Sequence, residues 1–161
     1  MSAYKKIDSA IEAFNKLDWP LYIIGDGEQK EYLKSIAGKN IKFLGFVKRE
    51  ELPDYYRNAR ALIFPGEDDF GITAVEAMSA GTPVIALRKG GAKETIIEGA
   101  TGEFFDHSVP PLIAEAVVSF AENEKKYDRA AIARHAEKFS RERFEIEIKD
   151  YVRKIVGEEK K

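Results

Sequence analysis

The sequence predicts an α/β fold, a Rossmann-like parallel sheet with helices on both faces. Short apolar segments such as 21–24 (LYII) and 84–87 (VIAL) alternate with longer segments whose apolar residues recur at helical spacing. Strands that alternate with helices are typical of parallel sheets, because parallel neighbours need a long crossover connection and are covered on both faces. No internal repeat or low-complexity linker interrupts this alternation.

Each element of this fold is placed by its local pattern. Ile7, Ile11 and Phe14 recur at the spacing that gives the first helix an apolar face. We expect one domain over residues 1–156 and a disordered, solvated tail at 157–161. The predicted strands are 21–24, 41–44, 61–64, 84–87 and 102–105, and the predicted helices are 4–17, 28–37, 50–58, 72–80, 94–98, 109–122, 126–138 and 141–156.

The composition excludes several classes of protein. The 161 residues hold 26 lysines and arginines against 28 acidic residues, so no basic surface for nucleic acid is predicted. The chain has no cysteine, which excludes a disulfide framework and a thiolate metal site. No apolar run approaches the roughly 20 residues of a membrane span, and the N-terminal residues lack the apolar centre of a signal peptide. We therefore expect a cytoplasmic protein.

The segment 64–84, FPGEDDFGITAVEAMSAGTPV, is the most informative part of the chain. The strand at 61–64 runs into an acidic loop with glycines, and a helix that carries Glu76 follows. A strand, a tight loop and a helix N-terminus present free backbone N–H groups and a positive dipole end to a phosphate. Carboxylates are poor phosphate ligands but accept hydrogen bonds from sugar hydroxyls. The segment therefore predicts a ligand that carries both phosphate and sugar.

This segment also carries a resemblance to a known family. DDFGITAVEAMSAGTPVIA and the following GGAKETI resemble the C-terminal, donor-binding half of glycosyltransferase family 4 (group 1), the retaining GT-B enzymes. The family signature is two acidic residues with seven others between them, which Asp68 and Glu76 reproduce around Phe70 and Gly71. Consecutive family segments also resemble, in the same order, KKIDSAIEAFNKL, LYIIGDGEQKEYL, IKFLGFVKREELPDYY and KFSRERFEIEIKDYV. The resemblance thus covers nearly the whole chain.

The resemblance implies catalytic roles for the two acids. Glu76 would accept hydrogen bonds from the ribose hydroxyls of a nucleotide sugar, since a cis-diol offers two donors to its two oxygens. Asp68 stands where the family has a glutamate that binds a hydroxyl of the donor sugar. Its side chain is one methylene shorter, which changes either the affinity for the sugar or the sugar itself.

The resemblance also implies a set of donor-binding residues. The backbone N–H groups of Gly71, Ile72 and Thr73, together with Phe70 before them, would hold the sugar and the diphosphate at the helix start. Lys5 resembles the lysine that neutralises the diphosphate. The nucleobase would lie against the loop that contains Phe46 and Val47. No metal is implied, because helix N–H groups and basic side chains stabilise the leaving diphosphate.

The chain departs from the family pattern at its N-terminal end. The family has a strand with an arginine before the Lys5 helix and an acceptor-binding domain before that strand, whereas residues 1–4 alone precede Lys5 here. In the order 3-2-1-4-5-6 the absent first strand is central, and a gap there leaves two rows of buried backbone groups unpaired. We therefore predict that the 21–24 strand pairs directly with the 61–64 strand, or that another chain, in a homo-oligomer for example, supplies the missing strand.

The family resemblance also implies a donor substrate and a partner domain. FPGEDDFGIT and GGAKETI resemble mannosyltransferase-like members, which favours GDP-mannose and leaves a UDP sugar open. Transfer would need an acceptor-binding domain or subunit, which would also explain any peripheral association with a membrane. Two other interpretations stay open, a binding module that holds a nucleotide sugar without transfer, and an interaction domain that has lost the ligand.

Several of these residues also have a purely structural interpretation. Asp68 and its neighbour Asp69 are residues that commonly cap a helix or shape a turn. Lys5 lies beside a second lysine and fits a solvent-facing position. Gly90 and its neighbour Gly91 fit a tight turn between a strand and a helix.

Overall fold

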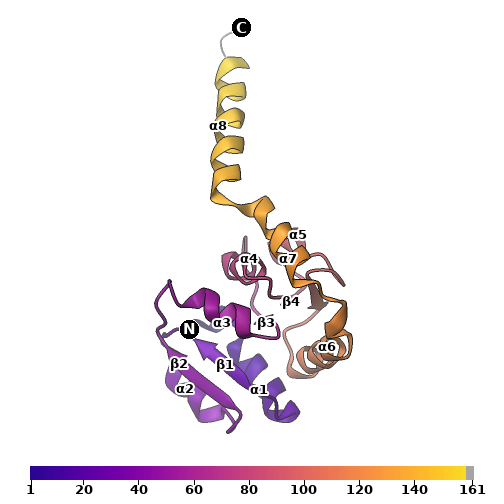
Figure 1. Ribbon diagram of the computed structural model, residues 1–161. Helices are drawn as coiled ribbons and strands as arrows, with labels where there is room; N and C mark the ends of the chain where they lie inside the picture. The colour runs from indigo at the N-terminus through magenta and orange to yellow at the C-terminus, as the bar shows by residue number, and fades with distance from the viewer. Residues whose placement is uncertain (159–161) are drawn as a thin grey trace.

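The computed structural model describes residues 1–158, in which strands and helices alternate as the sequence predicts (Figure 1). The strands are β1 (Leu21–Ile24), β2 (Ile41–Gly45), β3 (Leu62–Phe64), β4 (Val84–Leu87) and β5 (Gly102–Phe105). The α-helices are α1 (Ile7–Leu17), α2 (Lys30–Ile36), α3 (Leu52–Asn58), α4 (Ile72–Ser79), α5 (Ala92–Thr95), α6 (Pro110–Asn123), α7 (Arg129–Ala136) and α8 (Arg141–Glu158). Short 3-10 turns are η1 (Ala3–Lys5), η2 (Glu124–Lys126) and η3 (Glu137–Phe139). Every paired strand is parallel to its neighbour, which confirms the α/β fold class.

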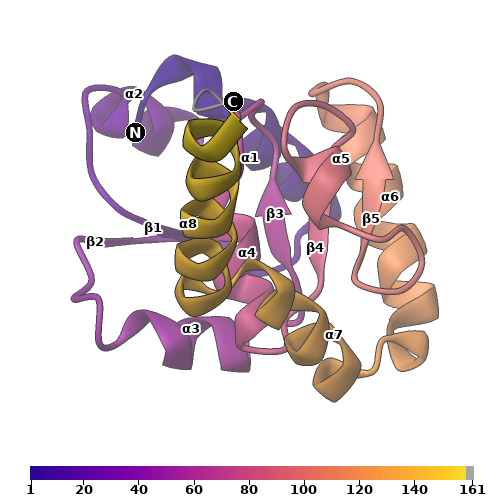
Figure 2. The same cartoon turned by 90° about the horizontal axis from the view of Figure 1, so that it is seen from above.

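The strands form two parallel sheets rather than one. β1 pairs with β2, and β3, β4 and β5 pair in that order. Figure 2 shows the β1–β2 pair on one side of the molecule and the other three strands on the opposite side. β1 and β3 are not paired within residues 1–158, so the predicted direct pairing of these two strands is wrong. Side chains of both strands instead line an apolar groove that lies between them.

The core is densest around β4, the middle strand of the larger sheet. All four β4 residues are buried, and Ile85 is 1% exposed. Helix α4 packs on β3 and β4, and α6 packs on β4 and β5. Figure 1 shows α4 and α7 on one side of this sheet and α6 on the other. A strand covered on both faces needs apolar residues at consecutive positions, which the sequence VIAL provides.

Several helices begin or end at residues other than the predicted ones. α1 begins at Ile7 and not at residue 4, because Lys6 adopts a left-handed conformation with φ of 53°. Residues 3–5 form the separate turn η1, and this turn carries Lys5. α7 begins at Arg129, because the Asp128 carboxylate accepts hydrogen bonds from two backbone N–H groups of the first turn at 2.8 and 3.2 Å.

Helix α8 extends away from the rest of the molecule (Figure 1). It continues to Glu158, so residues 157–158 of the predicted tail are helical, and the remaining tail at 159–161 lies outside the described residues. Its apolar side chains include Phe144 and Tyr151, which are 64% and 62% exposed. None of the helices within residues 1–158 is long and apolar enough to cross a membrane.

Truncation of Ile85 should destabilise the fold strongly. Ile85→Ala removes a fully buried side chain from β4, and the residual cavity should lower the free energy of unfolding by about 2–5 kcal/mol. Ile97→Ala is the matched control, because the Ile97 side chain is 47% exposed and should change stability by less than about 0.5 kcal/mol. Urea unfolding followed by circular dichroism measures both values. Equal losses for the two variants would contradict the assignment of β4 to the core.

Candidate functional site

The helix α4 begins with free backbone N–H groups at its N-terminus. Gly71 is the residue before the helix, has φ of 78°, and offers no side chain that could cap it. The Gly71 carbonyl accepts hydrogen bonds from the N–H groups of Ala74 (2.9 Å) and Val75 (3.3 Å). The N–H groups of Ile72 and Thr73 have no acceptor within the first helical turn, and the side chains of these two residues are exposed beside them. This end of α4 is therefore open to an anionic ligand.

Lys5 and Asp68 form an ion pair at this site. The Lys5 Nζ donates a hydrogen bond to the Asp68 Oδ2 at 2.6 Å, and each side chain is 33% exposed. The contact is possible because η1 passes directly over Gly66, where a Cβ atom would lie 2.8 Å from the Lys5 Cα. Two residues 63 positions apart in the sequence thus meet, which the local pattern around Lys5 does not predict.

The ion pair shifts the pKa of both groups. The hydrogen bond from Lys5 is the main cause that holds the pKa of the Asp68 carboxyl below its ordinary value of 3.8, and the backbone N–H groups of Asp69 and Gly71 act in the same direction. Partial burial lowers the pKa of the Lys5 ammonium, but its hydrogen bonds to Asp68 and Tyr4 outweigh this effect and raise the pKa above 10.5. Asp68 is therefore an anion held between the Lys5 ammonium and the start of α4.

The loop that carries Asp68 is positioned by Gly90 and Gly91. The Gly91 N–H donates a hydrogen bond to the Asp68 carbonyl at 2.9 Å. A Cβ atom at Gly90 would lie 2.3 Å from that carbonyl oxygen, and one at Gly91 would lie 2.4 Å from the Phe70 Cα. These two glycines therefore allow two backbones to touch, which is a packing role. Phe70 is itself 44% exposed and lies edge-on to the Phe139 ring, with 6.0 Å between the centroids.

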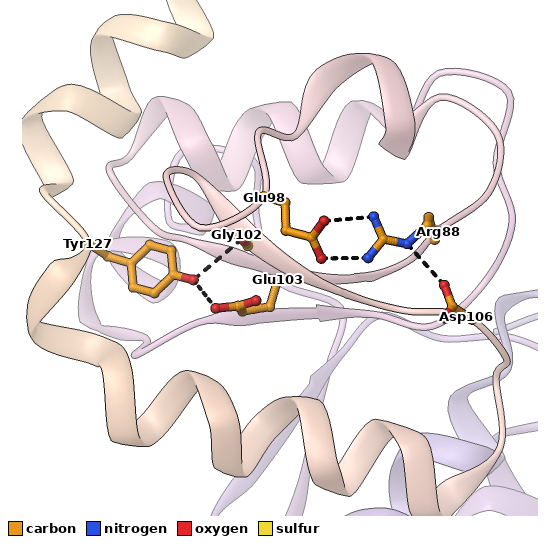
Figure 3. Close-up of polar contacts among 6 residues, drawn as sticks. All are labelled: Arg88, Glu98, Gly102, Glu103, Asp106 and Tyr127. Atoms are coloured by element: carbon orange, nitrogen blue, oxygen red, sulfur yellow. Dashed lines mark hydrogen bonds and ion pairs between the residues drawn. The ribbon is translucent and has the colours of Figure 1, made fainter.

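The segment that contains Gly90 and Gly91 is fixed by a cluster of ion pairs (Figure 3). The Arg88 guanidinium donates two hydrogen bonds to the Glu98 carboxylate, at 2.8 and 2.5 Å, and one to Asp106 at 3.0 Å. Nearby on β5, Glu103 accepts a hydrogen bond from the Tyr127 hydroxyl. The hydrogen bonds from Arg88 lower the pKa of the Glu98 carboxyl. The two ends of the 88–98 segment are thus tied together beside β5.

Glu76 lies in a separate small pocket of about 200 Å³, on the second turn of α4. The Tyr56 hydroxyl, which reaches it from α3, donates a hydrogen bond to the Glu76 Oε2 at 3.4 Å. Burial of the Tyr56 ring, followed by the nearby Glu76 charge, raises the pKa of Tyr56 to about 12. Tyr56 therefore stays protonated at neutral pH and donates to the carboxylate. Arg49 and Arg57 line the same pocket.

The structure brings together some of the predicted site residues and not others. Lys5, Asp68 and Gly71 meet at the start of α4, as described above. Phe46 is 82% exposed and follows Gly45 at the end of β2, and Val47 is half-buried. Neither of these two lines the Glu76 pocket, although Arg49 of the same loop does. Tyr56 is not predicted from the sequence, because the only signal there is an aromatic residue in a short helix.

The side chains that could bind a metal ion do not cluster in the part of the chain that the structure describes. Within residues 1–158 no three histidine or acidic side chains lie close enough together to hold a metal ion. His135 contacts the Thr95 carbonyl through its Nε2 at 2.8 Å and lies edge-on to Phe139. It therefore packs α7 against the end of α5.

The chain matches a known family. The sequence profile of the family described as "Glycosyl transferases group 1" matches residues 1–138. The chain belongs to this family. An uncharacterised glycosyltransferase of Methanocaldococcus jannaschii is 30% identical over 142 residues, which are 85% of this chain and 40% of that protein.

Superposition on solved structures shows which part of a GT-B protein this chain corresponds to. It superposes on sucrose-phosphate synthase from Thermosynechococcus elongatus with a TM-score of 0.85 and 22% identity, over 97% of this chain and 43% of that one. It superposes on Anabaena HepE in complex with UDP-glucose with a TM-score of 0.77 and 24% identity, over 98% of this chain and 46% of that one. The chain therefore has the fold of the C-terminal domain and spans less than half of these proteins.

Gly91→Ala should destabilise this glycosyltransferase domain. The new Cβ would meet the Phe70 Cα and the Asp69 carbonyl oxygen, so the backbone of the acidic loop must move, at a cost of about 1–3 kcal/mol. Gly157→Ala is the matched control, because a Cβ there meets no atom within 4 Å and helix propensity alone should stabilise α8 by up to about 1 kcal/mol. Urea unfolding measures both. An unchanged midpoint for Gly91→Ala would contradict the close packing of the two loops.

The Lys5–Asp68 ion pair should stabilise the fold at neutral pH and cease to do so in acid. The pKa of Asp68 is lower in the folded chain than the ordinary 3.8, so the stabilisation is present above that value and is lost as the pH falls through the folded pKa. Because both side chains are a third exposed, we expect about 1 kcal/mol or less.

Asp68→Asn measures this contribution. The variant should be less stable than the unchanged chain at neutral pH, and the difference should shrink towards about pH 3, as urea midpoints would show. Asp69→Asn is the control, because Asp69 is exposed and forms no ion pair within residues 1–158. A difference for Asp68→Asn that stays constant with pH would contradict the assigned ion pair.

Proposed function

We propose that this chain is the donor-binding half of a retaining glycosyltransferase and binds a nucleotide-diphosphate sugar. The observation that carries this proposal is the open N-terminus of α4 beside the Lys5–Asp68 pair. A helix start and an ammonium group together favour the two negative charges of a diphosphate. In the absence of donor, the Asp68 carboxylate holds these groups. A bound diphosphate would take over the contacts with Lys5 and the Gly71 N–H, and would release Asp68 toward the sugar hydroxyls.

Glu76 would bind the ribose of the same donor. Its carboxylate is partly buried, and the Tyr56 hydroxyl occupies one of its oxygens at 3.4 Å. The other oxygen is available for a ribose hydroxyl, and the Tyr56 hydrogen bond fixes the orientation of the carboxylate. Tyr56 is thus a positioning residue in this proposal, and Glu76 makes the direct contact.

The loop after β2 and the residue Asp68 would contact the nucleobase and the sugar, respectively. The loop with Phe46 and Val47 would border the base, since it follows β2 and leads through Arg49 to the Glu76 pocket. The sequence motif favours GDP-mannose, whereas the HepE structure holds UDP-glucose. Asp68, which is one methylene shorter than the glutamate expected at its position, is the residue through which this chain would select its sugar.

Transfer of the sugar would require a second domain. The chain spans 40% of the M. jannaschii relative and 43% of the sucrose-phosphate synthase chain, which leaves room in such proteins for an acceptor-binding domain. That domain, in the same protein or in a partner subunit, would exclude water and orient the acceptor hydroxyl. We place this activity in the cytoplasm, at the membrane periphery where the second domain binds it.

The alternative is a module that binds a nucleotide sugar without transferring it. The Asp68 side chain favours this candidate, because it is one methylene shorter than the glutamate expected at its position and reaches less far toward the sugar. Addition of an acceptor-binding domain from a relative separates the two proposals. The module would bind nucleotide and show no transfer.

A nucleotide titration tests the donor site. The full chain is titrated with GDP, UDP, ADP and their sugar conjugates, and ligand at about 100 times its dissociation constant should add roughly 2.7 kcal/mol of apparent stability. Glu76→Gln should weaken the binding by about tenfold, since it removes one charged acceptor from the ribose. Glu115→Gln, an exposed position on α6, should change nothing. Thermal shift measures all three, and no stabilisation by any nucleotide would overturn the proposed donor site.

A further inference from the structure

Arg88 lies where β4 ends and the glycine segment that supports the acidic loop begins. It is the first residue after β4, and its backbone N–H donates a hydrogen bond to the Phe105 carbonyl of β5 at 2.9 Å. Two residues later, the backbones of Gly90 and Gly91 touch the backbone of the loop that carries Asp68. The direction in which the chain leaves β4 therefore determines how these two backbones meet.

The Arg88 side chain is held by three neighbours (Figure 3). Glu98 accepts two hydrogen bonds from the guanidinium at 2.8 and 2.5 Å, and Asp106 accepts a third at 3.0 Å. The guanidinium also lies over the Phe104 ring, 4.7 Å from its centroid. An isolated exposed ion pair contributes little, but a bidentate pair within a network of charges has a defined geometry. The network thus fixes the guanidinium at the end of β4.

The same network closes the glycine segment into a loop. Glu98 lies ten residues after Arg88, and its backbone bridges to the start of β5. Between these two residues, the Gly91 carbonyl accepts a hydrogen bond from the buried Thr95 hydroxyl at 3.0 Å. Both ends of the segment and its middle are therefore fixed. The Gly91 N–H is left directed at the Asp68 carbonyl, 2.9 Å away.

We propose that Arg88 is a positioning residue for Asp68, the acid that would contact the donor sugar. Arg88 bonds to Glu98 and Asp106 rather than to Asp68, so it acts through the Gly90–Gly91 backbone. That backbone holds the acidic loop where the Asp68 carboxylate meets the Lys5 ammonium. The consequence for sugar binding rests on the proposed function, whereas the positioning of Asp68 does not.

The pKa of the Asp68 carboxyl reports on this position without any ligand. Hydrogen bonds from Lys5 and from the backbone N–H groups of Asp69 and Gly71 hold that pKa below 3.8, and each of them requires the loop in its place. Arg88→Met frees the end of the glycine segment, so it should raise the pKa of Asp68 toward 3.8. Carbon-detected NMR of the side-chain carboxyl, followed through an acid titration, measures this shift.

Glu98→Ala separates positioning from a direct effect of charge. Removal of the positive Arg88 charge would by itself raise the pKa of a neighbouring carboxyl, whereas removal of the negative Glu98 charge would lower it. Positioning predicts a rise of the Asp68 pKa in both variants, because each breaks the same bidentate contact. A rise in Glu98→Ala therefore cannot come from the lost charge.

Hydrogen exchange gives a second readout, at the contact itself. The Gly91 amide should exchange roughly fivefold faster in Arg88→Met than in the unchanged chain, because its hydrogen bond to the Asp68 carbonyl opens more often. The Leu62 amide is the internal reference for general loosening of the sheet, since it donates to the Pro83 carbonyl at 2.9 Å. Its exchange should change less.

Arg60→Met is the matched control variant. Arg60 also pairs with a glutamate, Glu124, at 2.5 Å, and also lies over an aromatic ring, that of Trp19, at 5.7 Å. It precedes β3, however, at the opposite end of that strand from the acidic loop. This variant removes a comparable ion pair and should leave both the Asp68 pKa and the exchange of the Gly91 amide unchanged.

Binding of the donor tests the functional consequence. Arg88→Met should weaken the binding of a nucleotide sugar more than that of the bare nucleotide, because Asp68 would contact the sugar alone. Thermal-shift titrations compare GDP with GDP-mannose and UDP with UDP-glucose. In the pair that binds, the ratio of the two dissociation constants should change by roughly threefold or more. An equal loss for both members of the pair would contradict a role of Arg88 in sugar binding.

Two results would overturn the positioning of Asp68 by Arg88. One is an Asp68 pKa that fails to rise in either Arg88→Met or Glu98→Ala. The other is an increase in exchange at Leu62 equal to that at Gly91, which would mean that the whole sheet loosens. The NMR measurements use no nucleotide, so their failure is distinguishable from failure of the nucleotide titration.

Discussion

The arrangement of the proposed donor site depends on one close contact between two backbones. Gly90 and Gly91 lie against the loop that carries Asp68 so closely that neither position has space for a Cβ atom. The contact sets the path of the loop between β3 and α4, and thereby the place where α4 begins. The Arg88–Glu98 ion pair fixes the ends of the glycine segment at the neighbouring strands. The acidic loop is thus held from the β4 side.

Electrostatics then determine what this loop does in the absence of ligand. The start of α4 attracts an anion, and Lys5 supplies a positive charge beside it. The Asp68 carboxylate pairs with Lys5 and accepts from the backbone at the start of α4, and these interactions hold the pKa of that carboxyl low. A diphosphate carries more negative charge than a carboxylate, so in the proposed function it would displace Asp68 from these groups. In that proposal the ion pair would keep the site organised between binding events and would cost the donor part of its binding energy.

The sequence predicted the parallel strands, the helices and the motif at the start of α4, because each depends on a local pattern of apolar residues and glycines. It failed where distant segments meet. The Lys5–Asp68 contact depends on the left-handed conformation of Lys6, which a lysine seldom adopts and no local pattern signals. The separation of the two sheets depends on what lies between β1 and β3, and strand pairing over such distances leaves no local signal. Tyr56 was missed because its role comes from the packing of α3 against α4.

The separation of the two sheets bears on the proposed donor site. The loop with Phe46 and Val47 follows β2 and belongs to the smaller sheet, whereas Glu76 and the start of α4 follow the larger one. Within residues 1–158 no strand ladder links the two sheets, and helix packing, chiefly of α1 on α6, holds them together. A donor that contacts Glu76 through its ribose and the Phe46 loop through its base must span both sheets. Whatever fixes the relative position of the two sheets would therefore strengthen the binding of such a donor, as linkage requires.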